Sequence, residues 1–156
     1  MACNIVLFQP EIPPNTGNIA RTCAITGIKL HLIKPLGFSI DDKAVKRAGL
    51  DYWHLLDLEV HESIEAFLDK YGMCDLHFSS TKGAKLYSDV VYEEDSYIVF
   101  GRETSGLPKA IYEKYNKQLM TIPMSEKEGV RSLNLSNAVA IVAYEALRQL
   151  NFPGLV

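Results

Sequence analysis

The chain has 156 residues, enough for a single domain over residues 1–156 with a hydrophobic core. Hydrophobic residues make up 47% of the sequence and charged residues 22%, and no apolar run is long enough to span a bilayer. The net charge of −3 argues against a non-specific nucleic-acid binder, although a local basic patch remains compatible with it. Because the first residues lack the pattern of a signal peptide, we expect a cytoplasmic protein without a membrane partner.

The cysteines and histidines do not predict a metal site or a disulfide framework. The three cysteines, Cys3, Cys23 and Cys74, are odd in number and form no C-x-x-C pair. The four histidines are scattered along the chain without metal-binding spacing. We therefore expect free thiols, structural histidines and no metal.

Strand-like and helix-like segments alternate along the chain. Short apolar runs rich in β-branched or aromatic residues predict strands at Asn4–Gln9, Lys29–Ile33, Asp75–Ser79, Ile98–Phe100 and Gln118–Ile122. Helical patterns fall at Asn18–Thr26, Asp41–Ala48, Ser63–Tyr71, Pro108–Tyr115 and Asn134–Leu150. This alternation predicts an α/β fold, a mostly parallel sheet with helices on both faces. Ligands of such sheets bind beyond the carboxyl ends of the strands, so the loops that follow strands are the candidate site.

The first such loop, residues 11–21, is rich in helix-cap residues. These are Asn15, Thr16 and Asn18, and Gly17 among them permits positive φ. Arg21 is expected in the first helical turn, where a cation opposes the helix dipole and an anion should balance it. An ordinary well-capped helix is the alternative interpretation of Asn15 and Gly17.

The second loop, residues 101–108, follows an apolar strand and precedes a helix. Gly101 and Gly106 let the backbone approach a ligand closely, and Pro108 suits the first helical position. The spacing is neither G-x-G-x-x-G nor a Walker A loop, so it supports neither NAD nor ATP. An exposed surface charge is the alternative interpretation of Arg102.

The third loop runs from Ile122 to the start of the last helix. Its polar cap-type residues are Ser132, Asn134, Ser136 and Asn137. One cap is enough for a helix, so the surplus indicates hydrogen bonds to another partner. Capping alone is the alternative interpretation of Asn134.

The last helix is apolar on two sides. One side carries Leu135, Ala138, Val139, Val142, Ala146 and Leu150, and the other carries Ala140, Ile141, Tyr144 and Leu147. In so short a chain, one side is expected to face the sheet and the other a second copy of the chain. This predicts a homodimer with Ile141 and Tyr144 at its interface. A helix covered within its own monomer is the alternative, and core packing is the alternative role for Tyr144.

Three segments resemble, in order and spacing, the three motifs of the SpoU branch of the SPOUT methyltransferases. They are Asn15-x-Gly17-Asn18-x-x-Arg21, Phe100-Gly101-x-Glu103-x-x-Gly106-Leu107, and Ile122-Pro123-Met124 through Ser132-Leu133-Asn134-Leu135-Ser136-Asn137-Ala138. Residues 11–18 and 47–52 resemble in particular the TrmL (YibK-like) subfamily. The resemblance covers the whole chain. It implies the SPOUT α/β-knot fold with a C-terminal trefoil knot, and transfer of a methyl group from S-adenosylmethionine to the 2′-oxygen of nucleotide 34, a C or a modified U, in tRNA-Leu isoacceptors.

The same resemblance implies roles for individual residues. It places the cofactor against Ser79, Ser80, Thr81, Gly101, Glu103, Gly106, Ile122, Met124, Ser132 and Leu133. The catalytic residues expected are Arg21, Glu103, Ser132 and Asn137. The residues expected to bind the tRNA anticodon loop are Asn15, Asn18, Arg21, Lys82 and Arg131, with a solvated surface charge as the alternative for each cation.

Arg21 has a key part in related enzymes, sometimes as the base. Because a guanidinium stays charged in proteins, we instead expect Arg21 to bind a phosphate and stabilise the developing alkoxide, oriented by Glu103, Ser132 and Asn137. Two other functions remain open. One is methylation of a different tRNA or rRNA nucleotide, and the other is a non-catalytic Rossmann-like binding module.

Overall fold

The computed structural model describes residues 2–39, 43, 47, 50–129 and 132–156. Most of the predicted helix Asp41–Ala48 lies outside the described residues, as does the predicted substrate residue Arg131.

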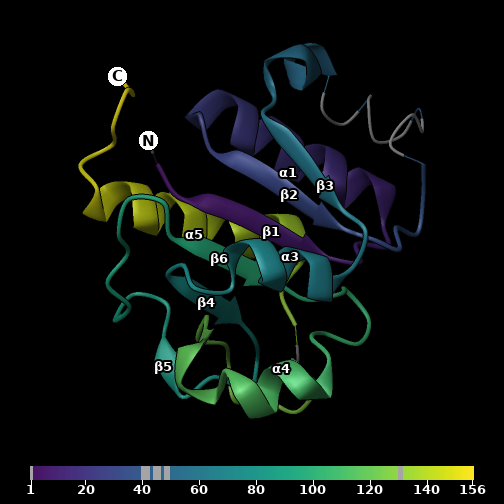
Figure 1. Cartoon of the computed structure of the whole chain (residues 1–156). Helices are drawn as coiled ribbons and strands as arrows, with labels where there is room; N and C mark the ends of the chain where they lie inside the picture. Colours follow the sequence, from purple (N-terminus) through teal and green to yellow (C-terminus); the bar gives the residue numbers. More distant parts are fainter. Residues whose placement is uncertain (1, 40–42, 44–46, 48–49, 130–131) are drawn as a thin grey trace.

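The described strands form one parallel sheet in the order β3-β2-β1-β6-β4-β7-β5 (Figure 1). The strands are β1 (Asn4–Phe8), β2 (Lys29–Ile33), β3 (Leu58–His61), β4 (Leu76–Ser79), β5 (Lys85–Leu86), β6 (Tyr97–Phe100) and β7 (Leu119–Thr121). The predicted α/β class is confirmed. The sequence patterns missed β3 and β5, the two edge strands, because edge strands are short and polar and give little apolar signal.

Helices cover both faces of this sheet. They are α1 (Pro13–Thr26), α3 (Ile64–Tyr71), α4 (Lys109–Lys114) and α5 (Leu135–Gln149), with 3-10 turns η1 (Leu50–Leu55) and η2 (Asn116–Gln118). Alternate residues of β1 point to opposite faces, as the strand period requires. Ile5 and Leu7 pack in the core with α1 and α5, whereas Val6 and Phe8 pack in the core with α3 and α4. Figure 1 shows α1 and α5 together in one layer.

Helix α1 begins at Pro13, five residues before the predicted start. The two prolines at its first positions set a helical φ, and the residue at the cap position, Ile12, offers no side-chain cap. The prediction that Asn15 and Gly17 belong to a capping loop before the helix is therefore wrong, because both residues lie inside α1. Arg21 consequently sits beyond the first turn, where the effect of the helix dipole has fallen off, so the expected opposition between them is absent.

Helix α5 begins after a side-chain cap at Asn134. The Asn134 Oδ1 accepts from the backbone N–H groups of Ser136 at 2.9 Å and Asn137 at 3.4 Å. Of the side predicted to face a second copy of the chain, Leu147 is fully buried in the core of the monomer, so its assignment to that side was wrong. Ile141 and Tyr144 are exposed, at 37% and 44%.

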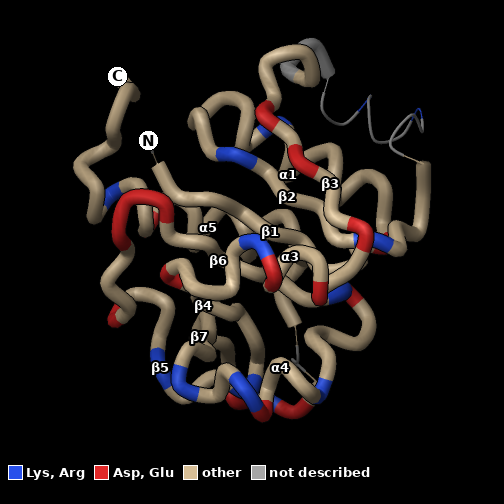
Figure 2. The backbone as a smooth tube through the Cα atoms, in the orientation of Figure 1, with Lys and Arg blue, Asp and Glu red and all other residues tan. Residues whose placement is uncertain are grey.

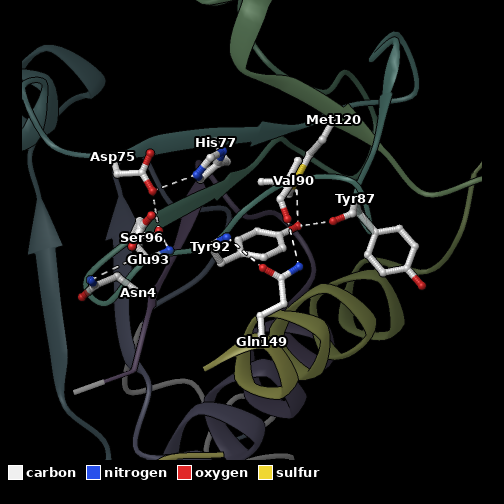
Figure 3. Close-up of polar contacts among 10 residues, drawn as sticks. All are labelled: Asn4, Asp75, His77, Tyr87, Val90, Tyr92, Glu93, Ser96, Met120 and Gln149. Carbon is white, nitrogen blue, oxygen red and sulfur yellow. Dashed lines mark hydrogen bonds and ion pairs between the residues drawn. The ribbon is translucent and has the colours of Figure 1, made fainter. Parts of the chain in front are cut away.

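A loop between β5 and β6 is fastened to α5 and to the start of β4 (Figure 3). The Gln149 side chain donates to the Val90 carbonyl at 2.9 Å and accepts from the Tyr92 N–H at 3.0 Å. Farther along the loop, the Ser96 hydroxyl donates to the Asp75 carboxylate. The two Gln149 bonds satisfy backbone groups of the loop that regular strand pairing would otherwise satisfy.

None of the described helices is long and apolar enough to cross a membrane. The trefoil knot implied by the resemblance stays a prediction.

Candidate active site

A cavity of about 580 Å³ opens where β4, β6 and β7 end. The residues that line it are 79–82 at the end of β4, 100–106 at the end of β6, Thr121, Ile122 and Met124 at the end of β7, residues 132–135 and Ala138 at the start of α5, and Ile12, Asn15 and Tyr112. The cavity thus lies beyond the carboxyl ends of parallel strands, where ligand sites of such sheets are found.

Every residue that the resemblance assigned to the cofactor lines this one cavity. They are Ser79, Ser80, Thr81, Gly101, Glu103, Gly106, Ile122, Met124, Ser132 and Leu133. Asn15 and Lys82 also line it, whereas Asn18, Arg21 and Asn137 do not. The structure therefore brings the predicted cofactor residues together and places part of the predicted catalytic and substrate set elsewhere, on α1 and α5.

The loop after β6 folds back on itself as a tight hairpin. The backbone N–H and C=O of Arg102 both pair with Gly106, each at 3.0 Å. Gly106 has φ +69°, and a Cβ on Gly101 would lie 2.4 Å from the Gly106 carbonyl carbon. A side chain at Gly101 would therefore push the hairpin open, so glycine keeps this wall of the cavity thin.

Two glutamates join this hairpin to the loop after β1. The Glu103 carboxylate accepts from the backbone N–H groups of Glu11 at 3.1 Å and Ile12 at 3.3 Å. In return, the Glu11 carboxylate accepts from the hydroxyl of Thr104 at 2.8 Å and from its N–H at 3.3 Å. Glu103 thus holds the entry to α1 against the cavity wall.

A pair of asparagines joins the first turn of α1 to the N-cap of α5. The Asn134 Nδ2 donates to the Asn15 Oδ1 at 3.1 Å, across 119 residues of sequence. Asn134 therefore both caps α5 and contacts the first loop, which goes beyond the capping-only interpretation. Asn15 is buried, and this hydrogen bond fixes the orientation of its side-chain amide, with Oδ1 toward Asn134.

Tyr112 is a cavity residue that the sequence analysis missed. It lies on α4, and its hydroxyl accepts from the Ser80 hydroxyl at 3.2 Å and from the Leu107 N–H at 3.4 Å. The Ser80 Oγ in turn accepts from the Lys82 N–H at 3.1 Å, and the Lys82 ammonium lies 4.8 Å from the centre of the Tyr112 ring. No loop motif contains Tyr112, so only its helical position beside the second loop could have indicated it.

Arg21 lies on the exposed surface of α1. Because α1 begins at Pro13, Arg21 lies farther along this helix than Ile12 and Asn15, which line the cavity. Arg21 is not among the residues that line the cavity.

A second polar cluster lies inside the sheet layer at β2 and β3. The ligand atoms of His31, Glu59 and His61 lie within 4.8 Å of one another, the one such group found in the described part of the chain. The Nδ1 of His31 lies 3.0 Å from the Nε2 of His61. Glu59 also accepts from Lys29, Lys70 and Tyr71. The carboxylate is thus already compensated by two ammonium groups, and the expectation that the chain binds no metal stays a prediction.

Burial sets the protonation of this cluster. Burial, and to a lesser extent the neighbouring His61, lower the pKa of His31 to about 3. For Glu59, burial acts to raise the pKa, but hydrogen bonds from Lys70, Lys29 and Tyr71 outweigh it and bring the pKa to about 2. Both histidines are therefore neutral and Glu59 is ionised at neutral pH.

The sequence profile of the SpoU rRNA methylase family matches residues 2–144. The chain belongs to the SpoU methylase family. One relative is the tRNA (cytidine(34)-2'-O)-methyltransferase of Escherichia coli strain K12, 49% identical over 154 residues, which cover 98% of this chain and 97% of that protein. A putative tRNA (cytidine(34)-2'-O)-methyltransferase of Bacillus subtilis strain 168 is 51% identical, with 99% and 98% covered.

Solved structures of SpoU relatives have the same fold. A putative RNA methyltransferase from Bacillus anthracis superposes with a TM-score of 0.90 at 53% identity, covering 98% of this chain and 97% of that one. A structure described as giving insights into the 2-OH methylation of C/U34 on tRNA also has a TM-score of 0.90, at 44% identity and 96% coverage of each chain. The expected SPOUT α/β fold is therefore confirmed.

Proposed function

We propose that this chain is an S-adenosylmethionine-dependent tRNA 2′-O-methyltransferase that acts on nucleotide 34, a C or a modified U, of tRNA-Leu isoacceptors. One observation carries the proposal. Three loops far apart in sequence meet in one cavity, and every residue that the motif resemblance assigned to the cofactor lines it. The names of relatives about half identical over nearly their whole length support the choice of tRNA and of nucleotide 34.

The cavity fits S-adenosylmethionine in size and chemistry. Its 580 Å³ lies within the range of roughly 300–1,000 Å³ common for small-molecule sites. Apolar side chains of Phe100, Ile122 and Leu133 stand beside exposed backbone and small polar groups. Because a Cβ at Gly101 would collide with the hairpin, backbone forms that wall and can contact a ligand directly. When bound, S-adenosylmethionine supplies a methyl group already activated on a sulfonium.

The protein's own residues must then place the ribose and stabilise charge on its 2′-oxygen. Positioning of this kind contributes up to about 7–11 kcal/mol in ideal cases. We assign Arg21 to the phosphate beside the target ribose, where its protonated guanidinium stabilises negative charge and does not act as a base. Glu103 acts through the loop, because its carboxylate holds the backbone of Glu11 and Ile12. Ser132 borders the cavity and is assigned to the ribose hydroxyl, and Asn137, in the first turn of α5, is assigned to its orientation.

RNA binding and assembly complete the proposal. Asn15 and Lys82 at the cavity, together with Asn18 and Arg131, are assigned to the anticodon loop. Figure 2 shows Lys and Arg interspersed with Asp and Glu around α4, beside the cavity. We propose a homodimer through the exposed Ile141 and Tyr144 of α5, acting in the cytoplasm, where tRNA is found.

Arg21→Lys tests the assignment of Arg21. The variant keeps the charge but loses the planar fork, so we expect turnover to fall about a hundredfold or more, as for loss of a transition-state donor. The affinity for S-adenosylmethionine should stay within about twofold of wild type, because Arg21 does not line the cavity. Single-turnover rates and calorimetry measure the two effects. Turnover near wild type would rule out this role.

The function itself is tested in two steps. Calorimetry with S-adenosylmethionine, followed by transfer of a tritiated methyl group to bulk tRNA, separates an enzyme from a non-catalytic binding module. Mapping 2′-O-methyl groups on tRNA from cells that lack the protein then identifies the nucleotide. Loss of the methyl group at position 34 of tRNA-Leu supports the proposal. Loss at another tRNA or rRNA position would show that the proposed nucleotide is wrong and that the proposed reaction, 2′-O-methylation, is right.

A further inference from the structure

Arg102 lines the cavity with an unusual side-chain environment. Its guanidinium carbon lies 5.4 Å from the centre of the Phe8 ring, at the end of β1. The Arg102 Nε is buried, and the described residues supply no hydrogen-bond acceptor to it. A buried N–H without an acceptor is uncommon in folded proteins and often marks the place of a missing ion, water or ligand.

The polar groups around Arg102 already have partners. Its own backbone N–H and C=O pair with Gly106. The Glu103 carboxylate accepts from two backbone N–H groups, and the Glu11 carboxylate accepts from both donors of Thr104. The hairpin is therefore fixed by other bonds, and the Arg102 guanidinium is not needed to hold it.

The chemistry of the guanidinium defines its missing partner. Its contact with the Phe8 ring uses the charge of the group and supplies no hydrogen-bond acceptor in the ring plane, so the buried Nε–H still lacks an acceptor. The Nε–H and the adjacent Nη–H point side by side and match two oxygens of a carboxylate or a phosphate. An arginine side chain has enough rotatable bonds to turn this edge from the Phe8 ring toward the cavity.

We propose that Arg102 is an oxyanion-binding residue of the cavity. On ligand binding, its guanidinium turns from the Phe8 ring and binds two oxygens of the ligand. This inference rests on the proposed function, which offers two oxyanions: the carboxylate of S-adenosylmethionine and a phosphate of the RNA. Neither the three motifs nor the resemblance gives this position a role.

Arg102→Met is the decisive variant, since methionine keeps an apolar stem against Phe8 but removes the charge and the fork. Lys117→Met is the matched control, because Lys117 is exposed and does not line the cavity. Wild-type binding of S-adenosylmethionine and tRNA is measured first, so that a failure of the proposed function is recognised independently.

The first set of measurements tests the carboxylate. Calorimetry compares S-adenosylmethionine with 5′-methylthioadenosine, which lacks the amino-acid part. If Arg102 binds the carboxylate, Arg102→Met weakens S-adenosylmethionine binding about tenfold or more, as expected for a lost charge-assisted hydrogen bond, and leaves 5′-methylthioadenosine binding unchanged.

The second set tests the phosphate. The tRNA dissociation constant is measured over a range of salt concentrations. If Arg102 binds a phosphate, Arg102→Met weakens tRNA binding and lowers the slope of log K against log salt by about one. Lys117→Met should change neither quantity to this extent.

Either result supports the proposal and names the source of the oxyanion. Two results overturn it. In one, Arg102→Met leaves the affinities for S-adenosylmethionine and tRNA and the salt slope at their wild-type values. In the other, it weakens 5′-methylthioadenosine as much as S-adenosylmethionine without changing the salt slope, which would mean that Arg102 only supports the shape of the cavity.

Discussion

The Tyr112 hydroxyl joins two loops that form different walls of the cavity. It accepts hydrogen bonds from Ser80, after β4, and from the backbone of Leu107, after β6. Both loops carry residues assigned to the cofactor, so their relative position should determine how well the cofactor fits. A side chain from α4, outside every motif, therefore contributes to the geometry of the site.

Tyr112→Phe should weaken cofactor binding. The phenyl ring fills the same space, but Ser80 and the Leu107 N–H lose their acceptor, at a cost of about 1–3 kcal/mol if the groups stay buried. We expect the dissociation constant for S-adenosylmethionine to rise about tenfold, measured by calorimetry. Tyr87→Phe is the control, because only the backbone carbonyl of Tyr87 enters the bonds shown in Figure 3. Equal effects of the two variants would contradict the prediction.

The paired histidines make the stability of the fold depend on pH. His31 is 0% exposed, and its Nε2 lies 3.3 Å from the Asn4 Oδ1. The geometry fits neutral rings in which the His61 Nε2–H faces His31 and the His31 Nε2–H faces Asn4. A second proton on His31 would point at an N–H of His61, which adds repulsion to the cost of burying the charge.

Stability should therefore fall on acidification. The unfolded chain binds a proton at His31 near pH 6.5, but burial holds the native pKa at about 3, so the unfolded state binds more protons between these values. Glu59 contributes to the pH dependence of stability only below its ordinary pKa of 4.5. Between pH 4.5 and 6.5 the dependence therefore comes from the histidines. The free energy of unfolding should fall there by up to about 1.4 kcal/mol per pH unit for each such histidine.

Urea titrations at several pH values check this dependence. His31→Gln should be less stable at pH 7, because a buried hydrogen bond is disturbed, but should show a shallower pH dependence. An unchanged slope in this variant would assign the acid sensitivity to other groups.

At the scale of elements, the loop between β5 and β6 depends on one side chain of α5. Gln149 bonds both to the Val90 carbonyl and to the Tyr92 N–H (Figure 3). Gln149→Ala should leave both backbone groups without partners and lower the free energy of unfolding by about 1–3 kcal/mol, visible as a lower Tm.

Arg148→Ala is the matched control for this variant. Arg148 neighbours Gln149 on the same helix, its side chain is 63% exposed, and in the described part of the chain it pairs with Glu145. Such a pair contributes about 0–1 kcal/mol, so the Tm should change little. A loss of stability as large as that of Gln149→Ala would contradict the role assigned to the loop contacts.

The sequence patterns predicted the elements with strong apolar signals. The buried strands β1, β2 and β6 and the amphipathic helices α3 and α5 were expected within one or two residues. The edge strands β3 and β5 were not predicted, because Glu59, His61 and Lys85 interrupt their apolar pattern. The start of α1 at Pro13 was not predicted, because Asn15, Thr16 and Gly17 are typical of a helix cap. Pro13-Pro14, however, favours the start of a helix.

The candidate site was predictable for a different reason. Periodicity placed the loops only at one edge of a sheet, whereas the motif resemblance selected the residues that share the cavity. Contacts that depend on three-dimensional packing were not predictable. Examples are the carboxylate of Glu103 on the backbone of residues 11–12 and the approach of Tyr112 from α4.

For the whole molecule, the layer of α1 and α5 presents apolar side chains to solvent. Ile141 and Tyr144 on α5 and Ile25 on α1 are all exposed. Exposed apolar side chains on the outer side of a helix layer are candidates for a protein–protein contact. Because a second copy would offer the same surface, a symmetric dimer would bury both sets together.

Tyr144→Glu should disrupt this dimer. A carboxylate in each of two facing copies would be costly to bury, so we expect a monomer at concentrations where the wild type is dimeric. Size-exclusion chromatography with light scattering measures the mass, and circular dichroism confirms that the variant is folded. A dimeric variant, or a monomeric wild type, would contradict the proposed interface.

The contact between Asn15 and Asn134 has a consequence for synthesis of the protein in the cell. The contact joins α1, which is made early in translation, to α5, which is made more than 100 residues later, and both helices contribute residues to the cavity. A nascent chain in which residues 132–149 are still inside the ribosome would therefore lack one wall of the pocket. Such a chain should not capture the methyl donor, however well its earlier strands have paired. Binding of the methyl donor then indicates that α5 has been made and has packed against α1, and a product truncated before α5 would be recognisable by its failure to gain protection from proteolysis when the donor is added.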